Sequence, residues 1–148
     1  MIGRIYVSWI VVVAVSAAGN VQAKAKPGRF VVDEKDVTVL DNLTKLTWQR
    51  VVPGQANYWQ AAKDYCKSLS LAGGGWRLPT VRELQSIVDF GHNNPSIDKT
   101  AFPNTPSENF WSATATSATS SYAWSVHFNN GNSDYGGIIG TYRIRCVR

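Results

Sequence analysis

The sequence predicts an α+β domain in which two helices pack on antiparallel β-sheet and long irregular loops join the elements. Three observations predict this class. Apolar residues recur at helical spacing in residues 57–70 and again in residues 79–91. Large and small residues alternate from Tyr122 to Phe128, which is typical of a half-buried strand. Residues 92–109 contain four Asn and three Pro, and this composition predicts a long loop.

The first 23 residues predict a secretory signal peptide. Arg4 supplies a positive start, residues 5–18 are almost wholly apolar, and the stretch ends in Val21-Gln22-Ala23. A second small-residue cleavage site would follow at Ala25. The apolar run is shorter than the about 20 residues that a membrane span needs. An uncleaved N-terminal anchor is the alternative to a cleaved signal peptide. We therefore expect an exported protein, periplasmic, secreted or at the cell surface, without a membrane span once the signal is removed.

Residues 24–36 are expected to form a flexible leader that runs into a first strand near residues 29–32. Val37 to Leu40 alternates weakly and reaches a turn at Asp41-Asn42, after which residues 46–49 resume as a strand. The sequence therefore predicts a short hairpin at the start of a domain that spans residues 37–148.

The first helix is expected to begin at Asn57 and to end near Ser70. Asn57 can accept a capping hydrogen bond, and Gln60 occupies the reciprocal position three residues later. Cys66 then lies on the apolar stripe of this helix.

The second helix has a clearer start. Thr80 and Glu83 have the spacing of a capping box, and Gly91 is the expected C-cap.

The C-terminal third predicts an antiparallel sheet. Asn130-Gly131 is a strong hairpin signal after the alternating strand. Residues 142–147 are expected to form the last strand, with Cys146 on the inward face and with Arg143 and Arg145 on the outward face.

The charge balance is mildly basic. The chain has 15 Lys and Arg against 10 Asp and Glu. Loss of residues 1–23 removes only Arg4 among these groups, which leaves a net charge of +4. A positive balance favours polyanionic partners such as sulfated or acidic glycans, nucleic acid or anionic lipid headgroups, without selecting one. The alternative is a soluble protein with a slight charge excess.

Two cysteines in an exported chain can form one intramolecular disulfide. A bridge between Cys66 and Cys146 closes a loop of about 80 residues, for which chain entropy alone gives about 4–5 kcal/mol. Two free buried thiols or an intermolecular bridge are the alternatives. His92 and His127 have no metal-ligand spacing to either cysteine, so no metal site is expected.

No catalytic constellation is visible. Gly73-Gly74-Gly75 lacks the Gly-Lys-Ser/Thr of a phosphate loop. Asp98, Glu108 and Asp134 are too scattered in the sequence to predict a calcium site. We therefore expect no catalytic residues, no bound metal and no cofactor.

A series of motifs in one order resembles a known family. They are Asp41-Asn42-Leu43-Thr44, Leu46-Thr47-Trp48, Tyr65-Cys66, Trp76-Arg77-Leu78-Pro79-Thr80, Pro95-Ser96-Ile97-Asp98, Phe102-Pro103-Asn104, Phe110-Trp111-Ser112, Tyr122-Ala123-Trp124 and Arg145-Cys146-Val147-Arg148. From about residue 39 to the C-terminus the chain resembles the C-terminal domain family of the Lcl adhesin, a bacterial family.

The resemblance implies a C-type-lectin-like fold and a Cys66–Cys146 bridge. It also assigns the tryptophans of the motifs to the core, namely Trp48, Trp76, Trp111 and Trp124. In the namesake adhesin the domain is a host-glycan-binding head on a collagen-like stalk. This chain has no Gly-X-Y repeat that would form such a stalk.

One polar face is the candidate ligand site, because Tyr can stack on sugars, Asn supplies paired donors and acceptors, and Arg can grip sulfate or carboxylate. Its predicted members are Asn129, Asn130, Asn132, Asp134, Tyr135, Arg143 and Arg145. The alternative is a polar hairpin whose basic neighbours solvate a sheet face.

Two functions follow as hypotheses. The first is an exported, non-enzymatic binding module for a polyanionic glycan or a protein partner at the cell surface, with no nucleic-acid partner. The second is an envelope-associated structural or interaction domain without glycan binding. A third, weaker hypothesis is a degenerate enzyme of the formylglycine-generating type, which would need two reactive thiols.

Overall fold

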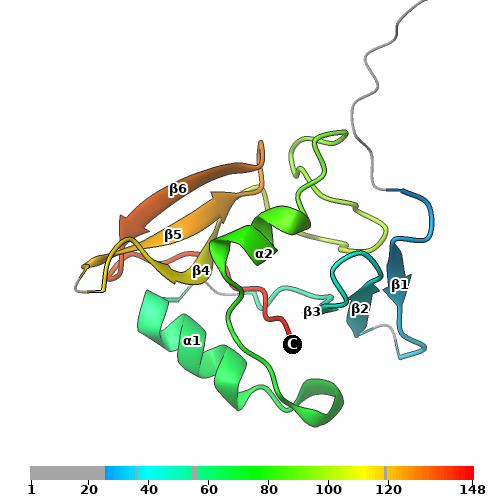
Figure 1. Cartoon of the computed structure of the whole chain (residues 1–148), viewed down its shortest axis with the longest axis horizontal. Coiled ribbons are helices and arrows are strands. Elements are labelled where there is room, and N and C mark those ends of the chain that lie inside the picture. Colours follow the sequence, from blue (N-terminus) through cyan, green and yellow to red (C-terminus); the bar gives the residue numbers. More distant parts are fainter. Residues whose placement is uncertain (1–25, 36, 55–56, 119) are drawn as a thin grey trace, which may run out of the picture.

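The two sheets lie at opposite ends of the molecule, with helix α2 between them (Figure 1). This computed structural model describes residues 26–35, 37–54, 57–118 and 120–148. The architecture is α+β with two α-helices and antiparallel sheet, as predicted. The strands form two three-stranded sheets in this part of the chain. The predicted signal peptide, residues 1–23, lies outside the described residues. Within those residues, no helix has the length and apolar character to cross a membrane.

The first sheet contains the predicted first strand and the predicted hairpin. It is formed by β1 (Phe30–Val32), β2 (Thr38–Asp41) and β3 (Thr47–Gln49), with β2 in the centre. The buried carboxylate of Asp41 closes the β2–β3 turn, because it accepts hydrogen bonds from the Leu43 N–H and the Thr44 hydroxyl.

Helix α1 (Trp59–Ser68) starts later than its sequence predicts. Its N-cap is Tyr58, whose side chain makes no capping hydrogen bond. The expected cap, Asn57, instead exchanges two backbone hydrogen bonds with Tyr142. This pairing fixes Asn57 in extended backbone, so the helix begins beyond it. A 3₁₀ turn, η1 (Leu71–Gly73), follows α1.

Helix α2 (Val81–Ser86) has the predicted capping box. The Thr80 hydroxyl accepts from the Glu83 N–H, and the Glu83 carboxylate accepts from the Thr80 N–H. The helix ends at Ser86, so the prediction that it extends to Gly91 is wrong. After the helix, the Asp89 N–H donates to the carbonyl of Ser96. The Asp89 carboxylate accepts a hydrogen bond from the Gly91 N–H. The Asp89 N–H is therefore bonded to the loop and is not available for a hydrogen bond within a longer helix.

The second sheet is formed by β4 (Asn109–Ala115), β5 (Tyr122–His127) and β6 (Asn132–Gly137), with β5 in the centre. The predicted hairpin joins β5 to β6. Gly131 stands in this turn with φ of 80°, a left-handed conformation that glycine adopts without strain.

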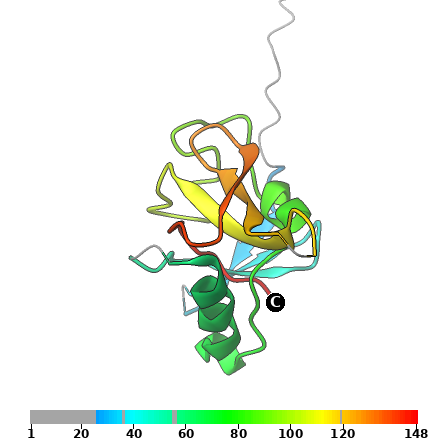
Figure 2. The ribbon, with the colours of Figure 1, turned by 90° about the vertical axis from the view of Figure 1, so that its left-hand side faces the viewer.

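The C-terminal segment (residues 142–148) is not the regular strand that the alternation predicted. Tyr142 bridges with Asn57, Arg143 with Phe110, and Val147 with both Trp48 and Arg77. Both faces of the segment are buried, because Ile144 and Cys146 pack into one part of the core and Val147 into the other. Figure 2 shows this segment in red, passing between α1 and the second sheet.

The core has two parts. One packs the first sheet, α2 and the long loop around Trp48, Phe102 and Phe110. The other packs α1 and β4 against the C-terminal segment and contains Trp76 and Trp111. Three of the four motif tryptophans are therefore in the core. Trp124 is not, since it is only partly buried and packs on the exposed ring of Tyr135, with the ring centroids 5.8 Å apart.

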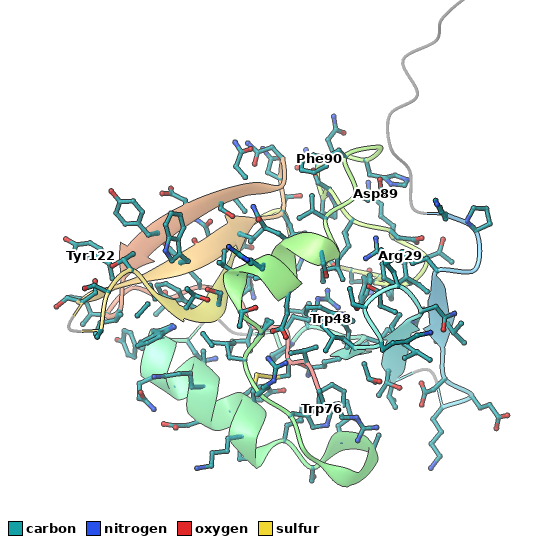
Figure 3. All side chains as sticks on the ribbon, viewed as in Figure 1. Arg29, Trp48, Trp76, Asp89, Phe90 and Tyr122 are labelled. Carbon is teal, nitrogen blue, oxygen red and sulfur yellow. A yellow bond between two sulfur atoms is a disulfide. The ribbon has the colours of Figure 1, made fainter. Side chains whose placement is uncertain are left out.

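The two cysteines form the predicted disulfide. Cys66 and Cys146 are joined with an S–S distance of 2.06 Å, and both residues are fully buried in the second core part. Figure 3 shows the bridge as a yellow bond close to Trp76. It fastens α1 to the C-terminal segment.

A candidate cationic groove

The predicted ligand face is divided among several places. Asn129 and Asn130 are exposed at the tip of the β5–β6 hairpin. Asp134 and Tyr135 are consecutive in β6, so their side chains point to opposite sides of the sheet. Asn132 is paired with His127 in the register of the sheet and shares the side of Asp134. The hairpin therefore presents polar side chains in several directions and not as one face.

Arg145 does not belong to any exposed face, and its predicted place there is wrong. Its side chain is fully buried. One terminal nitrogen donates to the carbonyls of Gln49 and Arg50, and the other donates to the Thr105 hydroxyl. The guanidinium carbon lies 4.7 Å from the centroid of the Phe102 ring. Burial lowers the pKa of Arg145 to about 9, which leaves it charged at neutral pH.

Arg143 is on the surface, but its charge is compensated. Its Nε and Nη2 atoms donate to the two carboxylate oxygens of Glu108 over 2.9 and 3.0 Å, and Nη1 donates to the carbonyl of Gly54. This fork holds the pKa of Glu108 below its ordinary value. Arg143 and Arg145 therefore do not form a positively charged patch on the surface.

A groove that the sequence did not reveal lies elsewhere, between α1 and the chain from Trp76 to Glu83. It has a volume of about 520 Å³. Its floor is apolar, with Trp76 and Leu78 almost fully buried beneath it. We call it the cationic groove; its lining residues are Lys63, Lys67, Trp76, Arg77, Leu78, Thr80, Glu83 and Ala113.

The helix positions two of the groove's cations. Ala62 and Cys66 form the buried stripe of α1. Lys63 and Lys67 each follow one of these residues and are four positions apart, so they lie on one side of the helix at the edge of its buried stripe. The Lys63 amine is 3.7 Å from the centroid of the Trp59 ring. Lys67 is exposed and has no hydrogen-bond or ion-pair partner in the described part of the chain.

The opposite edge carries a charge pair. Both terminal nitrogens of Arg77 donate to the Glu83 carboxylate over 2.7 Å. The hydrogen bonds from Arg77 and from the Thr80 N–H lower the pKa of Glu83 to about 2. Three cations therefore line the groove against one carboxylate, which stays ionised at neutral pH.

The stabilising effect of Glu83 is expected to depend on pH. Its folded pKa of about 2 lies below its ordinary value of 4.5, so ionised Glu83 stabilises the fold above about pH 4.5. That contribution is lost as the pH falls toward 2. Urea unfolding of the wild type and of Glu83→Gln is expected to show a stability difference at neutral pH that shrinks progressively below pH 4.5. A difference that stays constant down to about pH 2 would contradict the assignment.

The molecule is thus a small disulfide-bridged α+β domain with one cationic groove on its described surface. The model of the Lcl C-terminal domain matches residues 37–148, and the chain belongs to this family. No curated protein matches the chain.

The groove residues Lys63, Lys67 and Arg77 were not among the predicted site residues. The spacing of the two lysines on the first predicted helix was visible in the sequence. The sequence did not show that the two lysines lie near Arg77, because this depends on how the chain after η1 returns along α1.

Proposed function

We propose that the chain is an exported, non-enzymatic binding module whose cationic groove binds a polyanionic glycan, sulfated or acidic. The observation that carries the proposal is the meeting of Lys63, Lys67 and Arg77 around one groove with Glu83 as its single acid. Ammonium and guanidinium groups bind sulfate and carboxylate, and the apolar floor offers a surface to the C–H faces of sugar rings.

Other features support the proposal. A volume of about 520 Å³ lies within the range of small-ligand sites. The disulfide fits an oxidising compartment outside the cytoplasm. It also joins the two thiols that chemistry of the formylglycine-generating type would need. We further infer that the arrangement is of the C-type-lectin-like kind, on the basis of its two helices, antiparallel sheets and long loop.

The double variant Lys63→Gln, Lys67→Gln is expected to elute from a heparin column at lower salt than the wild type. Removing two cations from the groove should raise the dissociation constant for a heparin-derived tetrasaccharide about 3- to 10-fold, because each exposed ion pair contributes up to about 1 kcal/mol. Isothermal titration calorimetry at low and at physiological ionic strength measures the change, which should shrink as salt screens the charges.

The matched control is Lys35→Gln, Lys99→Gln, which removes the same charge from two exposed positions outside the groove. It is expected to bind almost as the wild type does. An equal loss in both double variants would show general charge attraction and would refute the groove. The variant Glu83→Gln is expected to bind the tetrasaccharide more tightly than the wild type. Glutamine can keep the capping box, and the loss of the carboxylate leaves Arg77 free to bind the anion. Unchanged affinity in this variant would also count against the groove.

An envelope-associated interaction domain without glycan binding is the second candidate. It is favoured by an exposed apolar patch at Tyr58 and Ile139, which are 58% and 84% exposed. A glycan array without signal, together with specific crosslinking of one protein through this patch, would favour it over the first proposal.

A further inference from the structure

A second cavity has no part in the proposed function. It has a volume of about 530 Å³ and lies where the turn before β1, the β2–β3 turn and the chain after α2 meet. We call it the apolar cavity. Its apolar walls are formed by Phe30, Leu43, Ile87, Val88 and Phe90, and none of its lining residues lines the cationic groove.

One arginine holds the walls of this cavity in place. The Arg29 guanidinium donates to both carboxylate oxygens of Asp41, over 3.0 and 2.8 Å, and to the carbonyl of Ser86 over 2.6 Å. The Asn42 N–H donates to the carbonyl of Arg29, and its side-chain amide donates to the carbonyl of Gly28. The first sheet is thereby fastened to the end of α2, so the cavity is preformed.

The wall at Phe90 is supported from behind by the β5–β6 hairpin. A Cβ atom added at Gly131 would collide with the side chain of Val88 and touch the ring of Phe90. The hairpin tip therefore lies directly against this wall. Figure 3 shows Arg29, Asp89 and Phe90 grouped beside the end of α2.

The mouth of the cavity combines apolar surface with positive charge. Leu43 is 73% exposed and Phe90 is 59% exposed, so both leave apolar surface open at the cavity. The Asp89 carboxylate is almost fully buried and accepts from the Gly91 N–H, and the Arg29 guanidinium is paired with Asp41. The Lys26 amine has no hydrogen-bond or ion-pair partner among the residues that the structure describes. Lys26 therefore offers an ammonium group at the cavity.

We propose that the apolar cavity binds an amphipathic anion, a medium-chain aliphatic carboxylate, with its chain between Leu43 and Phe90 and its carboxylate at Lys26. The apolar walls provide the surface that an alkyl chain loses from water, and Lys26 supplies the complementary charge. The volume lies within the range of small-ligand sites. This inference does not rest on glycan binding at the cationic groove.

The test uses decanoate, with 1-anilinonaphthalene-8-sulfonate as a fluorescent reporter of the same amphipathic class. Wild-type protein is expected to enhance the fluorescence saturably at one site, and decanoate is expected to displace the reporter. The variant Leu43→Ser, Phe90→Ser should weaken decanoate binding about 10-fold or more, because two apolar contacts are lost. Both side chains are exposed, so circular dichroism and the unfolding midpoint should remain close to those of the wild type.

Two comparisons make the assignment specific. Ile139→Ser removes an apolar side chain that is 84% exposed and lies outside this cavity, and it is expected to bind decanoate as the wild type does. Lys26→Gln is expected to weaken decanoate about 2- to 5-fold and to leave decanol binding unchanged. Absent or non-saturable binding, or equal losses in the Ile139 and Leu43/Phe90 variants, would overturn the site. Equal effects of Lys26→Gln on decanol and decanoate would overturn the role of the anion.

Discussion

Replacing both Cys66 and Cys146 with alanine is expected to lower the free energy of unfolding by about 4–5 kcal/mol. The bridge joins residues 80 positions apart, so its loss releases a long loop in the unfolded chain. Both residues are fully buried, and alanine leaves no unpaired polar group at either position. A small domain has a total stability of about 5–15 kcal/mol, so this loss removes much of it. Urea unfolding under non-reducing conditions measures the change.

The single variants give the control for this prediction. Either Cys66→Ala or Cys146→Ala breaks the bridge alone, so each single variant should lose nearly as much stability as the double variant. Wild type unfolded in the presence of a reductant should match them. Losses of below about 1 kcal/mol in the single variants, or titration of two free thiols in the unreduced wild type, would contradict the bridge.

The variant Arg145→Ala is expected to lower the free energy of unfolding by about 3–5 kcal/mol. Alanine would leave a cavity beside Phe102 and would remove the donors that serve the carbonyls of Gln49 and Arg50 and the hydroxyl of Thr105. Buried acceptors without donors are costly because water cannot replace the lost bonds. Denaturant unfolding followed by tryptophan fluorescence measures the loss.

Arg143→Ala is the matched control, two residues away on the same segment. Its ion pair with Glu108 is on the surface, so the loss should stay below about 1 kcal/mol. Arg145→Lys should be destabilising as well, because one ammonium group cannot reproduce the fork of the guanidinium or its contact with Phe102. Similar small effects at Arg143 and Arg145 would show that Arg145 is not the buried anchor described above.

The parts of the fold that the sequence predicts correctly depend on signals between neighbouring residues. The capping box of Thr80 and Glu83 and the Asn130-Gly131 turn are local, and the structure contains both. The disulfide followed from the family resemblance and is present as well. Failures occur where a distant segment decides the outcome: Asn57 is fixed by Tyr142, and α2 is shortened because the loop binds the backbone of Asp89.

The candidate site was less predictable for the same reason. Alternation placed Arg145 on the face opposite Cys146, and that face was expected to be exposed. In the structure this face is buried as well, with Arg145 against Phe102 and Val147 in the core. Lys63 and Lys67 were visible as a helical pair, whereas their meeting with Arg77 is a product of tertiary packing. Sequence reasoning therefore recovered the polar hairpin tip but not the groove.

The bridges of the C-terminal segment impose an order of assembly. Trp48, Arg77 and Phe110 all pair with residues that are synthesised after them. Until this segment arrives, the edge of β3 and the chain beside α1 lack their partners, and Cys66 has no thiol to join. A chain made from its N-terminus onward therefore completes this domain only after nearly all of it has been synthesised.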